Sequence, residues 1–211
     1  MTIELFGGGG QLPTYSWASK PASYSVGQPV FISDAGAKGS HWYYDGALWK
    51  PLGGECLLAS LDATVAGIAN SETIGFQYQM PAGLWQVGHQ LHVIASCTKS
   101  GSTDTGTLRG RIGTAGTTAD TQVFSAQVMN AAQRQFAGVA DLRLESATSV
   151  LELPVTTTLG YGAVNGVIGG ATTISSASAN SLFVDVSMVS GGTTDTVSLL
   201  AVQLFLIGKA N

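Results

Sequence analysis

Residues 74–80 read Ile-Gly-Phe-Gln-Tyr-Gln-Met, and their strict alternation of apolar with small or polar side chains decides the fold class. In an extended strand successive side chains point to opposite faces, so the four apolar residues would share one face and the glycine and glutamines the other. Residues 57–65 repeat the alternation, which places Leu57, Ala59 and Leu61 on the apolar face. A period of two is typical of a sheet with one buried face.

The same alternation continues to the C-terminus in short segments, separated by turn clusters rich in Gly, Ser, Thr and Asp. Antiparallel pairing allows such short connections between strands. The expected fold class is therefore all-β: an antiparallel β-sandwich, jelly-roll-like, preceded by a small β-hairpin module and an N-terminal arm. Further strands are expected at residues 90–98, 107–113, 139–145, 150–155, 182–189 and 197–207.

Residues 124–136 fit two structures. Apolar residues recur every four positions from Phe124 to Phe136, as on one face of a helix, and the local Ala, Gln and Met content favours a helix. Phe124, Ala126 and Val128 equally allow a strand. We favour a strand followed by a loop, because a sandwich of this length needs the additional pairing partner.

Composition divides the chain into three segments. Residues 1–24 contain an unbroken run of four glycines and no sustained period, which predicts an arm or linker. Residues 25–54 are expected to form a small aromatic β module with a hairpin at Asp45-Gly46, because Asp and Gly tolerate the backbone angles of a tight turn. Residues 55–211 are long enough to bury one sizeable core and are assigned to the sandwich domain.

Charge and hydropathy exclude several classes of protein. Charged residues make up 10% of the 211 and the net charge is −4, whereas 45% are hydrophobic, which excludes a disordered chain. Basic residues form no cluster, so we expect neither nucleic acid nor a membrane surface as a partner. The longest apolar run, 197–207, is too short to span a bilayer, and residues 1–10 lack the features of a secretory signal. So low a charge fits sheet faces that other subunits partly cover.

The sequence contains no local motif for a metal or cofactor, and we expect neither. His89 and His92 are an odd number of positions apart on an expected strand, so they face opposite sides and each is interpreted as a surface histidine. Cys56 and Cys97 are too few for a disulfide scaffold. Cys97 is interpreted as a buried free thiol, and a Cys56–Cys97 bridge is the alternative.

We also expect no enzymatic activity, because the sequence has no nucleophile elbow and no convincing pair of acids on one face. Asp141, Arg143 and Glu145 share a face that a solvated strand with alternating charges explains. Arg109 and Arg111 also share a face. They would bind a carboxylate or a sialic-type sugar, or, as we favour, form cross-strand ion pairs with these acids.

An aromatic cluster is the best candidate for carbohydrate binding. Sugar rings stack on aromatic faces, while acids bind the sugar hydroxyls. The alternative, which we favour, is that so small a module needs its rings as a core, with Trp42 and Trp49 paired across the hairpin. The candidate ligand-binding residues are Trp42, Tyr43, Tyr44, Trp49, Asp34 and Asp45, together with Arg109 and Arg111.

Two stretches resemble bacteriophage proteins. Residues 27–36, Gly-Gln-Pro-Val-Phe-Ile-Ser-Asp-Ala-Gly, followed by 39–46, Gly-Ser-His-Trp-Tyr-Tyr-Asp-Gly, and by Trp-Lys-Pro at 49–51, are similar to a short module of tail-fibre and other virion proteins of tailed phages. Residues 80–83, Met-Pro-Ala-Gly, and 108–117, Leu-Arg-Gly-Arg-Ile-Gly-Thr-Ala-Gly-Thr, with Asp120, are similar to β-sandwich head domains attached to that module.

The resemblance implies a non-enzymatic virion structural protein, a tail-fibre or tail-tip component that attaches the particle to the host surface. It implies a homo-oligomer, with a trimer favoured, assembled in the host cytoplasm. The N-terminal arm would dock on other virion proteins, and a host glycan or protein would be the further partner. The alternatives are a capsid decoration or head-fibre protein, a glycan-degrading enzyme and a free-standing lectin.

Overall fold

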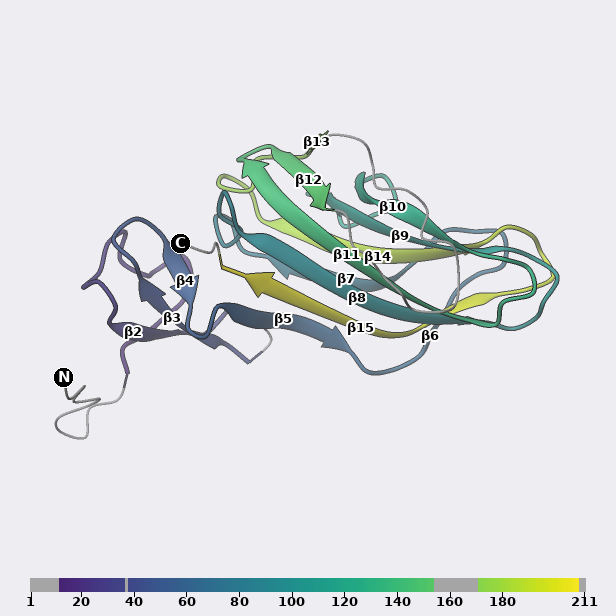
Figure 1. The fold of residues 1–211 in the computed structure, drawn as a ribbon, viewed down its shortest axis with the longest axis horizontal. Helices are drawn as coiled ribbons and strands as arrows, with labels where there is room; N and C mark the ends of the chain where they lie inside the picture. Colours follow the sequence, from purple (N-terminus) through teal and green to yellow (C-terminus); the bar gives the residue numbers. More distant parts are fainter. Residues whose placement is uncertain (1–11, 37, 154–170, 209–211) are drawn as a thin grey trace.

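The computed structural model describes residues 12–36, 38–153 and 171–208, and these are all-β. A small four-stranded sheet, coloured purple and blue in Figure 1, precedes a long two-layered sandwich. None of the described residues forms a helix long and apolar enough to cross a membrane. The expected fold class is confirmed.

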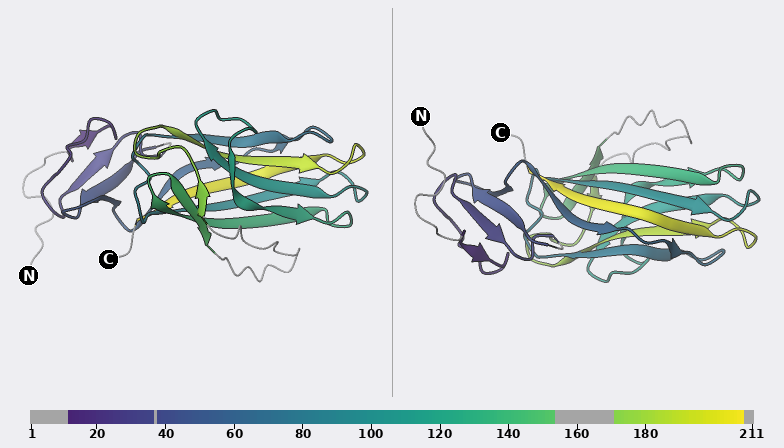
Figure 2. Two further views of the ribbon diagram at one scale, coloured as in Figure 1. Left: turned by 90° about the horizontal axis from the view of Figure 1, so that it is seen from above. Right: turned by 90° about the horizontal axis from the view of Figure 1, so that it is seen from below.

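The sandwich is built from two antiparallel sheets, which Figure 2 shows as facing layers. The first sheet has the order β10-β9-β14-β7, from β7 (Thr73–Met80), β9 (Gly106–Gly113), β10 (Thr121–Met129) and β14 (Leu182–Ser190). The second has the order β13-β12-β11-β8-β15-β5, with β6 beside β15. Its strands are β5 (Glu55–Leu61), β6 (Val65–Ala66), β8 (Gln90–Lys99), β11 (Gln135–Ser146), β12 (Ser149–Leu153), β13 (Ala171–Thr173) and β15 (Val197–Ile207).

The connections between the two sheets follow a jelly-roll order. Along the chain, β5, β8, β11 and β15 pair in one sheet, while β7, β9, β10 and β14 pair in the other. Among these eight strands the chain therefore crosses from layer to layer at every connection except β9–β10, as it does in double Greek-key sandwiches. The short β12 and β13 extend the second sheet beyond β11.

The alternation that defined the fold class is observed in β7 and broken in β5. In β7, Phe76 and Met80 are buried, whereas Gln77 is exposed. In β5, a register irregularity opposite Leu204 and Phe205 of β15 turns Leu58 into the core and leaves Leu57 46% exposed. The expected inward position of Leu57 is therefore wrong, because a β-bulge inserts one residue at Leu58 and shifts the faces on its two sides relative to each other. Ala59 and Leu61, after the bulge, pack against the core as expected.

The ambiguous segment 124–136 is a strand followed by a loop, as favoured. β10 runs to Met129, and β11 begins at Gln135. The ring of Phe124 lies directly over Gly110 of β9, where a Cβ atom would come within 1.5 Å of the ring. Tertiary packing against this glycine thus overrides the local helix propensity.

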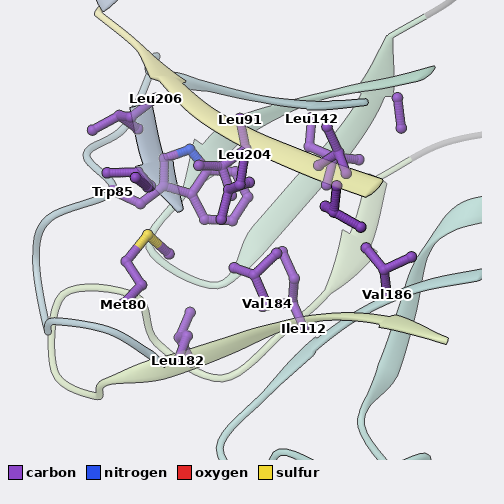
Figure 3. Close-up of a cluster of buried hydrophobic side chains, with 14 of the residues drawn as sticks. Met80, Trp85, Leu91, Ile112, Leu142, Leu182, Val184, Val186, Leu204 and Leu206 are labelled. Atoms are coloured by element: carbon purple, nitrogen blue, oxygen red, sulfur yellow. The ribbon is translucent and has the colours of Figure 1, made fainter. Parts of the chain in front are cut away.

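The core between the sheets is filled by side chains from both layers (Figure 3). Trp85, from the β7–β8 connection, closes one end and donates its indole N–H to the His89 carbonyl at 3.1 Å. Close packing of this kind is the main source of stability for a sandwich. The labelled core residues are Met80, Trp85, Leu91, Ile112, Leu142, Leu182, Val184, Val186, Leu204 and Leu206.

The small sheet begins earlier than the sequence suggested. Its strands are β1 (Thr14–Tyr15), β2 (Pro29–Ile32), β3 (Ser40–Tyr44) and β4 (Trp49–Pro51), in that order. β1 pairs parallel to β2, the one parallel pairing among the described strands. The expected arm over residues 1–24 therefore enters this sheet at Thr14, while residues 1–11 lie outside the described part of the chain. The sheet β1–β4 with residues 12–54 is called the aromatic module below.

Candidate functional site

The side chain of Trp42 lies in the core of the aromatic module. It points to the same face of β3 as Tyr44 and is fully buried, whereas Tyr43 points to the opposite face and is half-buried. Its ring packs edge-on against Trp17, with ring centroids 5.0 Å apart. Its indole N–H donates to Ser40 Oγ at 2.7 Å. Burial leaves no face of Trp42 for a sugar ring, so the core interpretation accounts for it.

Trp49 is also buried in the core of the aromatic module, but it does not pair with Trp42 as expected. It lies opposite Tyr44 across the hairpin, with centroids 5.7 Å apart, whereas Trp42 lies opposite Pro51. Tyr24 also packs against the Trp49 ring, with ring centroids 5.9 Å apart. The expected Trp42–Trp49 pair is therefore wrong, because the register of β3 and β4 places Tyr44 opposite Trp49 and leaves Trp42 to pack against Trp17.

The two acids of the aromatic module anchor turns. Asp34 accepts the backbone N–H of Trp17 at 2.6 Å, which ties residues 12–24 to the end of β2. Asp45 accepts the N–H groups of Leu48 and Ala47 at 2.7 and 2.9 Å and pairs with Lys50 at 2.8 Å. The hydrogen bond from Leu48 is the main reason that the pKa of Asp45 falls to about 2. Asp45 therefore stabilises the hairpin turn, as acids in such turns commonly do, whereas Asp34 fixes residues 12–24 against the end of β2.

Arg109 and Arg111 lie on the outer face of the first sheet and converge on Glu72. Arg109 Nη1 is 2.7 Å from Glu72 Oε2, and Arg111 donates to both oxygens at 2.8 and 3.0 Å. Ser187 Oγ donates a further hydrogen bond at 2.6 Å. Burial opposes the charge of Glu72, yet these donors lower its pKa below the usual value. The favoured ion pairing is thus present, with Glu72 in place of the acids that the sequence suggested, since Asp141 pairs with His92 and Glu145 with Arg143.

A second carboxylate on this outer face is fully buried. Asp185 of β14 lies opposite Arg111 of β9 and Gln77 of β7 in the sheet register. Neither of its oxygens makes a hydrogen bond of good geometry with the described residues, although the neighbouring Gln77 side chain acts to lower its pKa. Burial is the main cause that raises its pKa to about 6, and the charge of Asp120 adds to this effect. An ionised carboxylate in this position weakens the fold.

We expect Asp185→Asn to stabilise the protein at neutral pH. The folded pKa of about 6 exceeds the unfolded value of 3.8, so the cost of ionising Asp185 is absent below the unfolded value and fully present above the folded one. Two pKa units correspond to roughly 2–3 kcal/mol. Urea unfolding should show this gain at about pH 7.5 and no gain at about pH 4. Asp62→Asn, at an exposed site, serves as the control, and a loss of stability at neutral pH would contradict the expectation.

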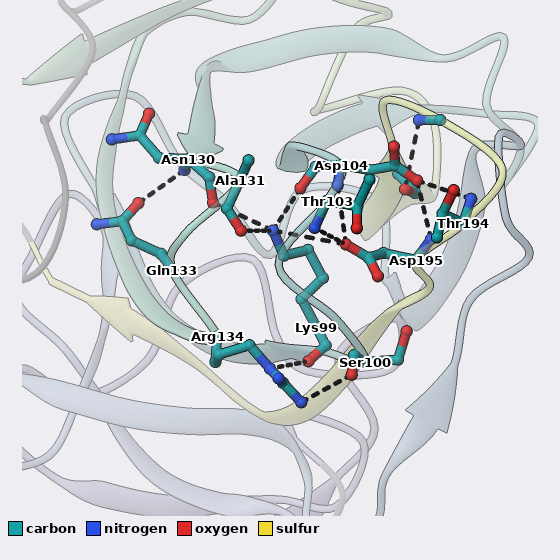
Figure 4. Close-up of polar contacts among 12 residues, drawn as sticks. Lys99, Ser100, Thr103, Asp104, Asn130, Ala131, Gln133, Arg134, Thr194 and Asp195 are labelled. Carbon is teal, nitrogen blue, oxygen red and sulfur yellow. Dashed lines mark hydrogen bonds and ion pairs between the residues drawn. The ribbon is translucent and has the colours of Figure 1, made fainter.

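A buried lysine organises the loops at the end of the sandwich away from the aromatic module (Figure 4). Lys99 is 1% exposed, and its ammonium group donates to the carbonyls of Asp104, Asn130 and Ala131, at 3.2 and 2.6 Å for the last two. Asp195 lies 3.9 Å from it. The single ammonium therefore joins the β8–β9, β10–β11 and β14–β15 loops, which we name the tip loops (100–105, 130–134 and 191–196).

Two of the tip loops also hold each other through their aspartates. Asp195 Oδ2 accepts the N–H groups of Thr103 and Asp104 at 2.8 Å each, and Asp104 Oδ2 accepts those of Thr194 and Asp195 at the same distance. A Cβ at Gly101 would come within 1.8 Å of Asp195 Oδ1, and one at Gly192 within 2.2 Å of Asp104 Oδ1. Glycine is required at both positions, and the loops are fixed in one arrangement.

The remaining chemistry-bearing residues are dispersed. His92 is partly exposed, but His89 is fully buried, so the expectation of a surface position is wrong for His89. Its burial lowers its pKa to about 4. Cys56 and Cys97 are both free and buried, which confirms the thiol interpretation. In the part of the chain that the structure describes, no three His, Cys, Asp or Glu side chains gather as they would around a metal ion.

Comparisons with known proteins give a structural likeness but no sequence family. No protein-family model matches the chain, and no curated protein matches it. Among solved structures, the chain is similar to one described as the CBM2 module of the evolved Dit of Lactobacillus casei BL23 phage J-1. The TM-score is 0.37 with 10% sequence identity, over 64% of this chain and 69% of that one.

Proposed function

We propose that this chain is a structural protein of a bacteriophage virion, a tail-fibre or tail-tip component that attaches the particle to the host surface without catalysing a reaction. The main support is the placement of its two ends. The aromatic module, which carries the motif similar to phage virion modules, lies at one end of the sandwich, and the locked tip loops lie at the other. One end would face the particle and the other the host.

The tip loops suit a neutral, hydroxyl-rich ligand. Their exposed side chains include Ser102, Thr103, Thr105, Thr193 and Thr194. Their charged groups are engaged within the loops: Lys99, Asp104 and Asp195 bond to one another's loops, and the exposed Arg134 donates to the carbonyls of Lys99 and Ser100. Hydroxyl groups both donate and accept hydrogen bonds, as sugars do. Loops that are fixed before binding lose little entropy on binding. A host surface glycan is therefore the ligand class that we propose for this end.

Binding to purified bacterial surface polysaccharides and lipopolysaccharides tests this proposal. We expect saturable binding by the full chain that Thr193→Trp weakens at least about tenfold, because a bulky ring would cover the tip loops. Thr114→Trp places the same substitution in an exposed loop at the opposite end of the sandwich and should leave binding unchanged. Equal weakening by both variants, or no binding to any host glycan, would contradict a glycan site at the tip.

A reducing-end assay on the same polysaccharides separates attachment from hydrolysis. We expect no release of reducing ends, because no carboxylate pair in the tip loops is free to act as acid and base. Labelled antibodies on intact particles would then distinguish a tail position from a capsid position.

A further inference from the structure

The aromatic module is fastened to one end of the sandwich by contacts between residues that lie far apart in the sequence (Figure 1). Gln86, in the β7–β8 connection, donates its side-chain amide N–H to the carbonyl of Trp49 in β4 at 3.1 Å. The backbone N–H of Gly208, which follows β15, donates to the carbonyl of Gly54 at 2.7 Å. Both bonds hold the end of the sandwich against β4. We name the region around them the joint (residues 49–54, 86–89 and 208).

The side chain of His89 is fully buried in the joint, and the connection that carries it, residues 81–89, contains no charged side chain. Neither ring nitrogen has a hydrogen-bond partner among the described residues, although the backbone of His89 is bonded to Gln86, Leu144 and the Trp85 indole. Buried polar side chains are nearly always hydrogen-bonded, so an exception needs an explanation. A neutral imidazole leaves one donor and one acceptor unpaired there, whereas an imidazolium would leave two donors and a charge. The joint therefore accommodates the neutral ring far better than the charged one.

The charges that act on His89 come from the aromatic module. Lys50 of β4 is 5% exposed, and its ammonium group pairs with Asp45 at 2.8 Å. After burial, the charge of Lys50 is the main effect that lowers the pKa of His89, and the charge of Asp45 opposes it. On the sandwich side, Arg143 and Glu145 of β11 point to the outer face of their sheet and pair with each other. A proton on His89 would therefore meet a buried positive charge from the opposite side of the joint.

Opening the joint would relieve both costs of a protonated His89. Like charges in a water-poor site repel each other more strongly than in water, and separation reduces the repulsion. Water that enters an open joint can accept hydrogen bonds from both ring N–H groups. The covalent link between β4 and β5 leaves room for such a movement, because a Cβ at Gly53 or Gly54 would meet no atom within 4 Å.

We infer that the joint is an acid-sensitive contact: β4 stays against the β7–β8 connection while His89 is neutral, and it separates from that connection when His89 is protonated. Acidic pH would then loosen the aromatic module without changing the sandwich. The inference goes beyond the proposed attachment role and does not depend on it, because the joint and the tip loops lie at opposite ends of the sandwich.

The pH range of the effect follows from the two states of His89. Burial, and then the Lys50 charge, lowers the pKa of the ring to about 4 in the closed joint, whereas the ordinary value of 6.5 applies when the joint is open. The closed joint keeps its full stability above the open-state pKa and loses it as the pH falls toward the closed-state pKa. At about pH 5 the equilibrium constant for opening should be roughly thirtyfold larger than at about pH 7.5.

Amide hydrogen exchange followed by NMR measures this opening, because a backbone N–H exchanges when its local structure opens. Gly208 donates across the joint, so its exchange, corrected for the intrinsic effect of pH, should become roughly thirtyfold faster from about pH 7.5 to about pH 5. It should also exceed the exchange of Val184, in the middle of β14, at both pH values. His89→Phe keeps a planar ring without titratable nitrogens and should abolish the acceleration. His41→Gln, at an exposed site, is the matched control and should retain it.

Three results would overturn the inference: no acceleration at about pH 5, an acceleration that His89→Phe retains, or equal exchange of Gly208 and Val184, which would show that the amide opens only with the whole fold. If His89→Phe does not fold, NMR titration of the wild-type histidine rings takes its place. His89 should then remain neutral at about pH 5, and a titration near its ordinary pKa would contradict the inference. Thr193→Trp should leave the exchange of Gly208 unchanged, which separates this test from that of the glycan site.

Discussion

Lys99→Met should lower the free energy of unfolding by about 3–5 kcal/mol, because removing one partner from a buried charged network leaves the others unpaired. Methionine keeps an unbranched apolar stem similar to that of lysine, so little packing is lost. The carbonyls of Asp104, Asn130 and Ala131 would lose their shared donor in a site without solvent. Each buried unsatisfied acceptor costs about 1–3 kcal/mol, which is consistent with the total.

Guanidinium chloride unfolding of the purified chain measures this loss. Lys38→Met, at an exposed position, provides the matched control and should change stability by less than about 0.5 kcal/mol. A loss below about 1 kcal/mol for Lys99→Met would show that the ammonium contributes little beyond its packing. Weaker glycan binding by Lys99→Met at temperatures where it remains folded would connect the lysine to the arrangement of the tip loops.

The sequence predicted those features of the fold that depend on neighbouring residues. Alternation located β7, and the Asp45-Gly46 pair located the hairpin of β3 and β4. The bulge in β5 could not be predicted, because both Leu57 and Leu58 are apolar and only the register with β15 decides which faces the core. Short apolar runs of this kind do not specify a register by themselves.

The candidate site was harder to predict than the fold, because it depends on contacts between residues that are distant in sequence. Glu72 lies 37 and 39 residues from the two arginines that bind it, and these contacts exist because β14 lies between β7 and β9. The reciprocal bonds of Asp104 and Asp195 span about ninety residues. The core position of Trp17 could not be predicted, because the sequence around it shows no helical or strand periodicity of apolar residues.

Several of the few charged residues are bonded to other groups of the molecule. Lys99 and Asp195 fix the tip loops, Glu72 binds two arginines, and Asp45 pairs with Lys50. Because Lys50, Lys99, Asp120, Glu152, Asp185 and Asp195 are buried, the surface carries fewer charges than the 10% content of the chain suggests. Serine, threonine and glutamine side chains therefore supply much of the polar surface.

Trp42→Ala should destabilise the aromatic module by about 3–5 kcal/mol, the usual cost of removing a fully buried tryptophan. The change would leave a cavity beneath Trp17 and remove the hydrogen bond to Ser40. Trp17→Ala should give a loss of similar size, because the two rings cover each other. That result would establish residues 12–24 as part of the module's core rather than as a free arm.

Unfolding curves for Trp42→Ala, Trp17→Ala and Tyr43→Ala together decide between a core and a ligand site. Tyr43 is on the opposite face of β3 and half-buried, so its truncation should cost clearly less than that of Trp42. If the tryptophans form the core of the module, their removal lowers its stability. Glycan binding at the tip loops of the sandwich should then persist in the molecules that remain folded. Unchanged stability with lost glycan binding in Trp42→Ala would instead establish the aromatic cluster as the sugar site, since a ring that stacks on a ligand contributes to binding and not to folding.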